Sequence, residues 1–125
     1  MFSTLPELSV NSSIKSAIGL YIDAFASLAR PVSDEVYDFS AMMRQVGFID
    51  VELTKYRLPI GAWGDTQTEK EVGRWNSLNF MEGIEGALLA CCTRQLGMTV
   101  EQIHEIVAAC RKEAKDKNKR LYYYL

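Results

Sequence analysis

The spacing of apolar residues changes at the stretch Tyr56-Arg57-Leu58-Pro59-Ile60-Gly61-Ala62-Trp63-Gly64. This stretch is followed closely by Gly73-Arg74-Trp75-Asn76. Before it, apolar and polar residues alternate, as in a strand with one buried face. After it, apolar residues recur every three or four positions, as in an amphipathic helix. Pro59 cannot donate to a strand ladder, and Gly61 and Gly64 permit tight turns. The sequence therefore predicts a strand, a rigid turn and a long helix, in that order.

The composition is that of one small globular domain. The chain has 125 residues, of which 48% are apolar and 24% charged, enough for a hydrophobic core. A net charge of −2 gives no overall electrostatic reason to expect nucleic acid or an anionic membrane as partner. The sequence contains neither a signal-peptide pattern nor an apolar run long enough for a transmembrane helix.

The few cysteines and the single histidine argue against a disulfide framework and a metal site. Cys91 and Cys92 are adjacent, Cys110 stands alone, and His104 has too few potential partners for zinc. No activating base lies near the cysteine pair in the sequence, so we interpret the cysteines as structural. Free cysteines favour a reducing compartment, and we expect a cytoplasmic protein, with the nucleus not excluded.

The N-terminal half predicts two helices and the strand. After an irregular lead-in over residues 1–10, Asn11-Ser12-Ser13 provides N-cap candidates for a helix that Pro31 ends. Ser33-Asp34-Glu35 predicts the start of a second helix, with Gly47 suited to its C-terminal cap. The alternating residues Phe48–Leu58 predict the strand.

The C-terminal half predicts the long helix, a final helix and a terminal strand. Capping boxes at Thr66–Glu69 and Thr99–Gln102 mark the two helix starts. The long helix would reach Gly97, but it contains three interior glycines, each costing about 1 kcal/mol relative to alanine. We therefore expect a bend or break between Gly73 and Gly86. We also expect Leu121–Leu125 to pair antiparallel with the strand Phe48–Leu58.

Together these elements predict a mostly helical α+β fold, with four or five helices and one strand pair. The single domain 1–125 divides into the lead-in 1–10, a helix–helix–strand part 11–58, a helical lid 59–120 and the terminal strand 121–125. The apolar faces of the first helix, the strand and the long helix are expected to form the core.

Four motifs in a fixed order resemble a known family. They are Val46-Gly47-Phe48-Ile49-Asp50-Val51, Leu58-Pro59-Ile60-Gly61-Ala62-Trp63, Gly73-Arg74-Trp75-Asn76 and Gly83-Ile84-Glu85-Gly86. Residues of about 30–115, and more weakly 10–30, resemble the C-terminal half of class I S-adenosylmethionine-dependent methyltransferases of fungal secondary metabolism, the LaeA-like group. The resemblance implies the remnant of a Rossmann-like fold, with Phe48–Leu58 as its sixth strand.

The same resemblance implies that the cofactor-binding motifs would precede residue 1. Family members hold S-adenosylmethionine on a glycine-rich turn after the first strand. Gly61-x-x-Gly64 follows a strand, but Pro59 and Trp63 depart from the small-residue pattern of such a turn. We therefore expect a truncated family member that binds no cofactor alone, so S-adenosylmethionine is implied by resemblance only.

The substrate-binding candidates come from the same motifs, and no catalytic residue is assigned. By resemblance, Trp63, Arg74 and Asn76 line an acceptor pocket under the helical lid. The alternative is that Trp75 lies in the core, Trp63 plugs the loop and Arg74 forms a salt bridge.

Glu85 is the fourth candidate. Together with Glu82 and Asn79 it offers hydrogen-bonding or acid–base groups on a glycine-containing helix, or else belongs to a solvated polar face. His104, beside the apolar stripe of the last helix, is interpreted as a partly exposed boundary residue.

Three functions remain open from the sequence. The first is a truncated methyltransferase-like protein of secondary metabolism that cannot transfer methyl groups alone. The second is a cofactor-independent pocket protein that guides cyclisation or isomerisation of a small-molecule metabolite. The third is a non-catalytic interaction module that dimerises or binds a partner chain through the exposed strand.

Overall fold

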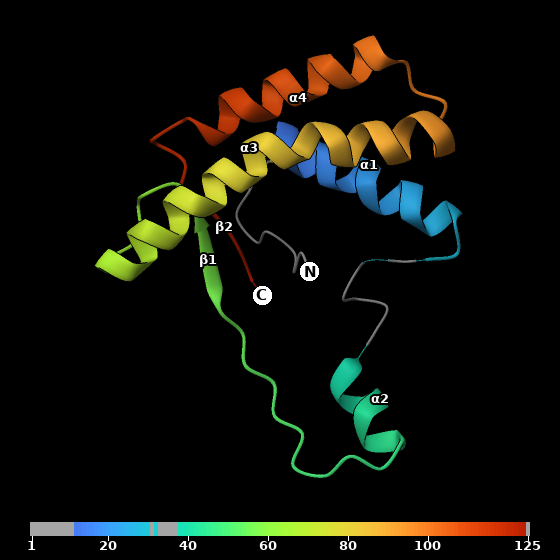
Figure 1. Ribbon diagram of the computed structural model, residues 1–125, viewed down its shortest axis with the longest axis vertical. Coiled ribbons are helices and arrows are strands. Elements are labelled where there is room, and N and C mark those ends of the chain that lie inside the picture. The colour runs from blue at the N-terminus through green and yellow to red at the C-terminus, as the bar shows by residue number, and fades with distance from the viewer. Residues whose placement is uncertain (1–11, 31, 33–37, 125) are drawn as a thin grey trace.

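The computed structural model describes residues 12–30, 32 and 38–124, which form four helices and a two-stranded antiparallel sheet (Figure 1). The elements are α1 (Ser13–Ser27), α2 (Phe39–Gln45), β1 (Arg57–Ile60), α3 (Gln67–Gln95), α4 (Val100–Ala114) and β2 (Leu121–Tyr124). Helices α1, α3 and α4 and the sheet form one body, from which α2 and the segment after it project. The expected mostly helical α+β class is confirmed. The lead-in 1–10 and the helix start predicted at 33–35 lie outside the described residues.

The predicted helix starts at Ser12, Thr66 and Thr99 are confirmed because they depend on local hydrogen bonds. The Ser12 side chain accepts from the backbone N–H of Lys15. The reciprocal bonds of a capping box are present at Thr66 with Glu69 and at Thr99 with Gln102. None of the helices in the described part of the chain is both long and apolar enough to cross a membrane.

Helix α3 is one continuous helix of 29 residues, so of the bend or break expected between Gly73 and Gly86 the break is wrong. Its ribbon curves along its length but remains a single element (Figure 1). The helix packs against α1, α4 and β1. These tertiary contacts outweigh a glycine cost of about 1 kcal/mol per position.

The antiparallel pairing of the two strands is confirmed, but the predicted position of the first strand is wrong. Strand β1 begins at Arg57, where the strand was expected to end, and Arg57 pairs with Tyr124 while Ile60 pairs with Leu121. Residues 51–56 have no regular structure. Of the apolar residues of the alternating segment, Phe48, Ile49 and Leu53 are exposed, and Val51 is half-buried. Both strands are edge strands, a position that tolerates proline, and β1 includes Pro59.

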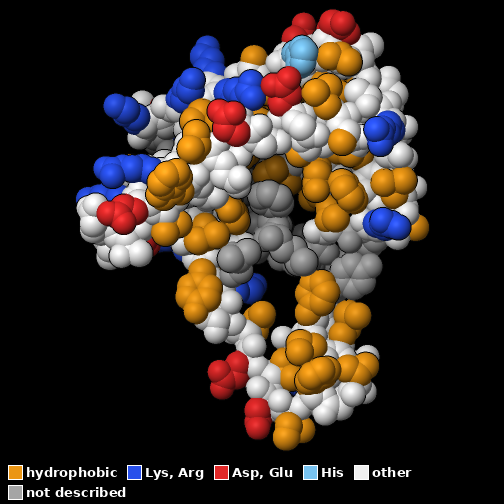
Figure 2. Space-filling model, viewed as in Figure 1, with side chains coloured by type: hydrophobic (Ala, Val, Ile, Leu, Met, Phe, Trp, Pro, Cys, Tyr) orange, Lys and Arg blue, Asp and Glu red, His pale blue; other side chains and the backbone are white. Residues whose placement is uncertain are grey.

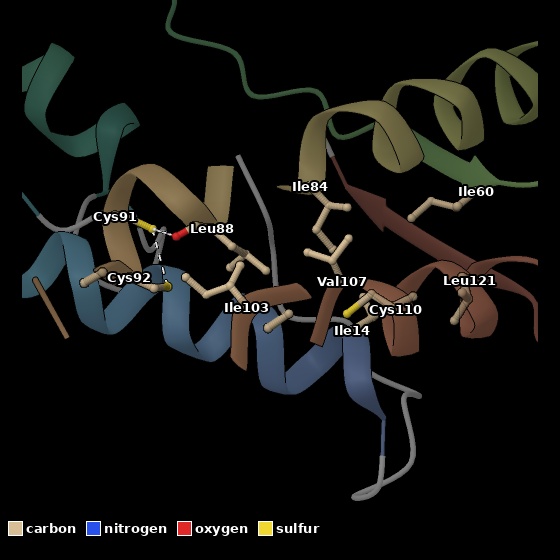
Figure 3. Packing of buried hydrophobic residues seen from close by; sticks show 12 residues of the cluster. Ile14, Ile60, Ile84, Leu88, Cys91, Cys92, Ile103, Val107, Cys110 and Leu121 are labelled. Carbon is tan, nitrogen blue, oxygen red and sulfur yellow. Dashed lines mark hydrogen bonds between the residues drawn. The ribbon is translucent and has the colours of Figure 1, made fainter. Parts of the chain in front are cut away.

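The core lies between α1, α3, α4 and the sheet (Figure 3). Its buried hydrophobic residues are Ile14, Ala17, Ala24, Ile60, Ile84, Leu88, Cys91, Cys92, Ile103, Val107, Cys110 and Leu121. The expected contribution of the first helix and the long helix is confirmed, but the predicted strand Phe48–Leu58 supplies no buried core residue; the sheet contributes Ile60 and Leu121 instead, and α4 supplies three further residues. Trp75 lies on the predicted apolar stripe of α3 but is 72% exposed. The alternative that placed Trp75 in the core is therefore wrong.

Candidate functional site

The turn between β1 and α3 is fastened to the sheet by Trp63. Its indole Nε1–H donates to the backbone oxygens of Ile60 and Leu121, at 3.2 and 3.0 Å. The Arg57 guanidinium lies 5.5 Å from the Trp63 ring centroid, and the ring meets Tyr122 edge-on. Because an indole has a single N–H donor, both bonds share it. The Trp63 side chain therefore fixes the turn to the sheet. This agrees with the alternative interpretation, in which Trp63 fills the loop and does not contact a substrate.

The glycines of this turn face the protein's own helix. Gly61 has a positive φ of 105°, and its N–H donates to the Gly73 carbonyl oxygen at 2.9 Å. A β-carbon on Gly73 would overlap the Gly61 carbonyl oxygen, and one on Gly64 would overlap the Glu69 side chain. In a cofactor turn, the missing β-carbons leave room for a phosphate or similar group. Here the position of a β-carbon on Gly64 is filled by Glu69 of α3, and the Gly61 carbonyl oxygen fills that of Gly73, so the turn packs against the protein's own helix.

Asn76 joins α3 to both strands. Its Nδ2 donates to the Pro59 carbonyl oxygen at 2.9 Å, and its Oδ1 accepts from the Tyr123 hydroxyl at 2.8 Å. One side chain thus satisfies a backbone group of β1 and a side chain of β2. Asn76 also lies on the wall of a cavity.

The cavity lies between α1, α3 and β2 and has a volume of about 280 Å³. Its described lining residues are Ile14, Ala17, Ile18, Tyr21, Asn76, Asn79, Phe80, Gly83, Ile84, Ala87, Leu88 and Tyr123. The wall is mainly apolar, with a few amide and hydroxyl groups. Such a cavity, with few polar groups in an apolar wall, has the character of a small-molecule site.

Glu85 lies on a different face of α3, toward α4. One carboxylate oxygen is 3.2 Å from Nη2 of Arg111, and the other is 3.3 Å from Nε2 of His104. Arg111 is held further by its Nε, which donates to the Met81 carbonyl oxygen at 2.9 Å. All three side chains are more than a third exposed, so solvent screens the pairs and their contribution to stability is small.

The four predicted binding residues do not converge on one site. Arg74 is exposed and forms no ion pair with the described part of the chain. Trp63 lies in the turn, Glu85 faces α4, and of the four only Asn76 lines the cavity. Among the described residues, no group of three histidine, cysteine or acidic residues is placed to hold a metal ion.

The aromatic residues of the cavity were not predicted from the sequence. Tyr21, Phe80 and Tyr123 come from α1, α3 and β2 and line it together. Asn79 was grouped with Glu82 and Glu85 in the sequence, yet it lies three residues after Asn76 and lines the same cavity. The i, i+3 spacing of the two asparagines was the available signal, because such residues share a helix face.

The matching proteins are fungal regulators and methyltransferases. The secondary metabolism regulator laeA of Aspergillus fumigatus is 30% identical over 96 residues, which are 77% of this chain and 26% of that protein. The secondary metabolism regulator LAE1 of Cochliobolus heterostrophus is 29% identical over 122 residues, covering 97% of this chain and 38% of the relative. The chain is distantly similar to part of LaeA. The protein-methionine methyltransferase laeA of Emericella nidulans is 28% identical over 102 residues, 82% of this chain and 27% of that protein.

The chain thus spans about a quarter to two-fifths of the length of these LaeA proteins. No protein-family model matches it. No solved structure matches it. The LaeA similarity agrees with the resemblance given by the sequence motifs around the β1–α3 turn.

Proposed function

We propose that this chain is the acceptor-side part of a methyltransferase-like protein of fungal secondary metabolism. On this proposal, the 125 residues bind a small metabolite but do not transfer a methyl group by themselves. The observation that carries the proposal is the 280 Å³ cavity between α1, α3 and β2, with Asn76 on its wall. Similarity to part of the LaeA regulators supports the assignment to secondary metabolism.

The second half of the proposal, no methyl transfer by this chain alone, is supported by the packing of the β1–α3 turn. Methyl transfer needs a donor held beside the acceptor in a fixed geometry. Gly64 is packed against Glu69 of α3 and the Gly61 carbonyl oxygen against Gly73, so this turn packs on the helix and leaves little room there for a cofactor. A donor site would have to come from another segment or another chain.

Titration calorimetry with S-adenosylmethionine tests this proposal. The folded 125-residue chain is expected to give no binding heat, and no labelled methyl group should pass from the donor to any acceptor. The methyltransferase laeA of Emericella nidulans, assayed at full length beside it, serves as positive control. Micromolar binding of S-adenosylmethionine by this chain would overturn the proposal.

The cavity also favours an alternative, in which the chain guides cyclisation or isomerisation of a metabolite without a cofactor. A pocket accelerates such a reaction by holding the reactive conformer of its substrate. Turnover of a metabolite in the absence of S-adenosylmethionine, abolished when the cavity is filled by substitution, would favour this alternative over the first proposal.

A second candidate function, an interaction module, rests on the projecting segment 38–56, which we name the α2 arm. Figure 2 shows hydrophobic side chains gathered on it. Its exposed large apolar residues are Phe39, Met42, Met43, Val46, Phe48, Ile49, Leu53 and Tyr56. The arm has internal order, because the Arg44 Nη2 donates to the Val51 carbonyl oxygen at 3.0 Å. Contiguous exposed apolar surface of this kind is typical of interaction sites.

As an interaction module, the arm would bind either a second copy of the chain or another protein, and sedimentation velocity tests the first of these. The double substitution Ile49→Lys with Leu53→Lys is expected to shift a dimer to monomer. Glu52→Lys with Thr54→Lys adds lysines to the same exposed segment without removing apolar surface, and should leave the dimer intact. A wild-type chain that sediments as a monomer at high micromolar concentration would rule out self-association through the arm.

A further inference from the structure

We propose that the cavity accepts an uncharged, flat molecule of about two fused rings that carries one hydrogen-bonding group. This inference rests on the proposed function, since it names the class of metabolite that the acceptor-side cavity would bind. It follows from four properties of the cavity: its volume, its aromatic wall, the absence of charge among its described lining residues, and the position of Asn79.

The volume sets the size of the ligand. A dry apolar cavity of about 150 Å³ accepts a benzene molecule. The cavity between α1, α3 and β2 has about 280 Å³, close to twice that volume. A single ring would leave much of the apolar wall without contacts, whereas two fused rings match the space.

The aromatic wall favours a flat ligand. Tyr21 of α1, Phe80 of α3 and Tyr123 of β2 line the cavity from three elements. Tyr21 is further held by Phe25, whose ring centroid is 4.7 Å away. Aromatic side chains pack against planar rings in offset or edge-on geometries, which adds to the burial of apolar area. Deeper apolar contacts come from Ile84 and Leu88, which are buried.

The charge of the ligand follows from the lining. None of the described residues that line the cavity carries a charge. Glu82 and Glu85 of α3 are each adjacent in sequence to a lining residue, but neither lines the cavity, and Glu85 pairs with Arg111 and His104 of α4. A charged ligand would lose its hydration without gaining a partner, which costs far more than the apolar contacts return.

The polar group of the ligand is directed to Asn79. Both amide groups of Asn76 are already bonded, to Pro59 and Tyr123. The amide of Asn79 forms no hydrogen bond with the described part of the chain, and this residue is exposed at the cavity. It can donate and accept, so it can pair with a hydroxyl, a carbonyl or a ring N–H. The ligand would lie with its polar edge at Asn79 and its rings toward Leu88.

Titration calorimetry with 2-naphthol tests the inference, with 2-naphthoate as charged probe of the same ring system and 1-octanol as flexible apolar probe. We expect 2-naphthol to bind at least tenfold more tightly than either of the other two. The matched variants are Gly83→Leu and Gly86→Leu, both on α3 at glycines where a β-carbon meets nothing within 4 Å. Only Gly83 lines the cavity. Gly83→Leu is expected to weaken 2-naphthol binding at least tenfold, and Gly86→Leu to leave it unchanged.

Asn79→Leu separates the polar contact from the apolar ones. It should weaken 2-naphthol binding by about two- to tenfold, the net value of one hydrogen bond, and leave naphthalene binding unchanged. If 2-naphthoate or 1-octanol binds as tightly as 2-naphthol and Gly83→Leu weakens that binding, the proposed ligand class is wrong. The cavity would still be a binding site, as the proposed function requires. If Gly83→Leu leaves 2-naphthol binding unchanged, the cavity is not the binding site. If none of the three probes binds, both the ligand class and the binding site are wrong. Binding of S-adenosylmethionine would overturn the proposed function alone.

Discussion

The backbone N–H of Gly61 donates to the carbonyl oxygen of Gly73 at 2.9 Å, and this bond holds the turn after β1 against helix α3. The contact depends on Gly73 having no side chain, because a β-carbon there would overlap the Gly61 carbonyl oxygen. Backbone atoms of a turn cannot move aside as a flexible side chain can. Gly73 is therefore required by close packing, although glycine is unfavourable in a helix interior.

Gly73→Ala is expected to lower the free energy of unfolding by about 2 kcal/mol or more, as overpacking of a close contact does. Gly86 lies on the same helix, is exposed and has open space around its β-carbon position. Gly86→Ala should raise the free energy of unfolding by about 1 kcal/mol, the difference in helix propensity. Urea unfolding followed by circular dichroism measures both values. Equal effects of the two substitutions would contradict the close-packing role of Gly73.

The features predictable from the sequence are the local ones. The capping boxes at Thr66 and Thr99 require only residues three positions apart, so the sequence contains all the information. The antiparallel pairing of the last strand was also predictable, because Leu121–Tyr124 has few other partners of strand character.

The features that could not be predicted depend on distant contacts. Alternation around Phe48–Leu53 produces a strand only if another surface covers the apolar face, and in the described part of the chain Ile49 and Leu53 of that face are left exposed. The continuity of α3 is decided by packing against three other elements, not by its glycines. The bond between Asn76 and Tyr123 joins residues 47 positions apart, which no periodicity reveals.

The bond between Tyr123 and Asn76 is open to a double-mutant cycle. Tyr123→Phe removes the donor and should destabilise the protein by about 1 kcal/mol. Asn76→Ala should cost more, about 2 kcal/mol, because it also leaves the Pro59 carbonyl oxygen without its donor. The double variant should be less destabilised than the sum of the two, with a coupling energy of at least about 0.5 kcal/mol. Additive effects would show that the hydroxyl and amide do not interact in solution.

Glu113 links α4 to the start of α1 and makes stability dependent on pH. The residue is 8% exposed, and its carboxylate accepts from the Ile14 backbone N–H at 3.1 Å and from the Lys119 ammonium at 2.7 Å. Burial alone raises the pKa of Glu113, but the bonds from Lys119, Ile14 and Ser12 outweigh it and hold the pKa below its ordinary value of 4.5. A lowered folded-state pKa stabilises the protein at pH values above 4.5 and this contribution is lost as the pH falls through the folded-state pKa.

Glu113→Gln is therefore expected to cost about 2 kcal/mol at pH 7, the usual range for hydrogen bonds to a charged group. The variant should also lose less stability than the wild type between pH 5 and pH 3. Glu105→Gln, at an exposed position of the same helix, is the matched control and should follow the wild-type curve. Parallel curves for wild type and Glu113→Gln across this pH range would contradict the lowered pKa.

The cysteines are expected to be unreactive in the folded protein, because all three are buried. Burial, with a smaller contribution from the hydrogen bond to Cys91, raises the pKa of Cys92 to about 12. Burial also raises the pKa of Cys110 to about 11, and its thiol lies 3.3 Å from the Ser13 carbonyl oxygen. Only the thiolate reacts with alkylating and disulfide reagents, so both conditions for reaction, access and ionisation, are unfavourable.

Titration with a disulfide reagent at pH 8 should label no thiol within minutes in buffer and all three in denaturant. The rate in buffer should follow the opening of the fold, so Gly73→Ala, which destabilises the protein, is expected to accelerate labelling and Gly86→Ala to slow it. Rapid labelling of one thiol in the stable protein would instead mark an accessible, ionised cysteine. That result would return the Cys91–Cys92 pair to the candidates for chemistry, because only an accessible and ionised thiol reacts quickly.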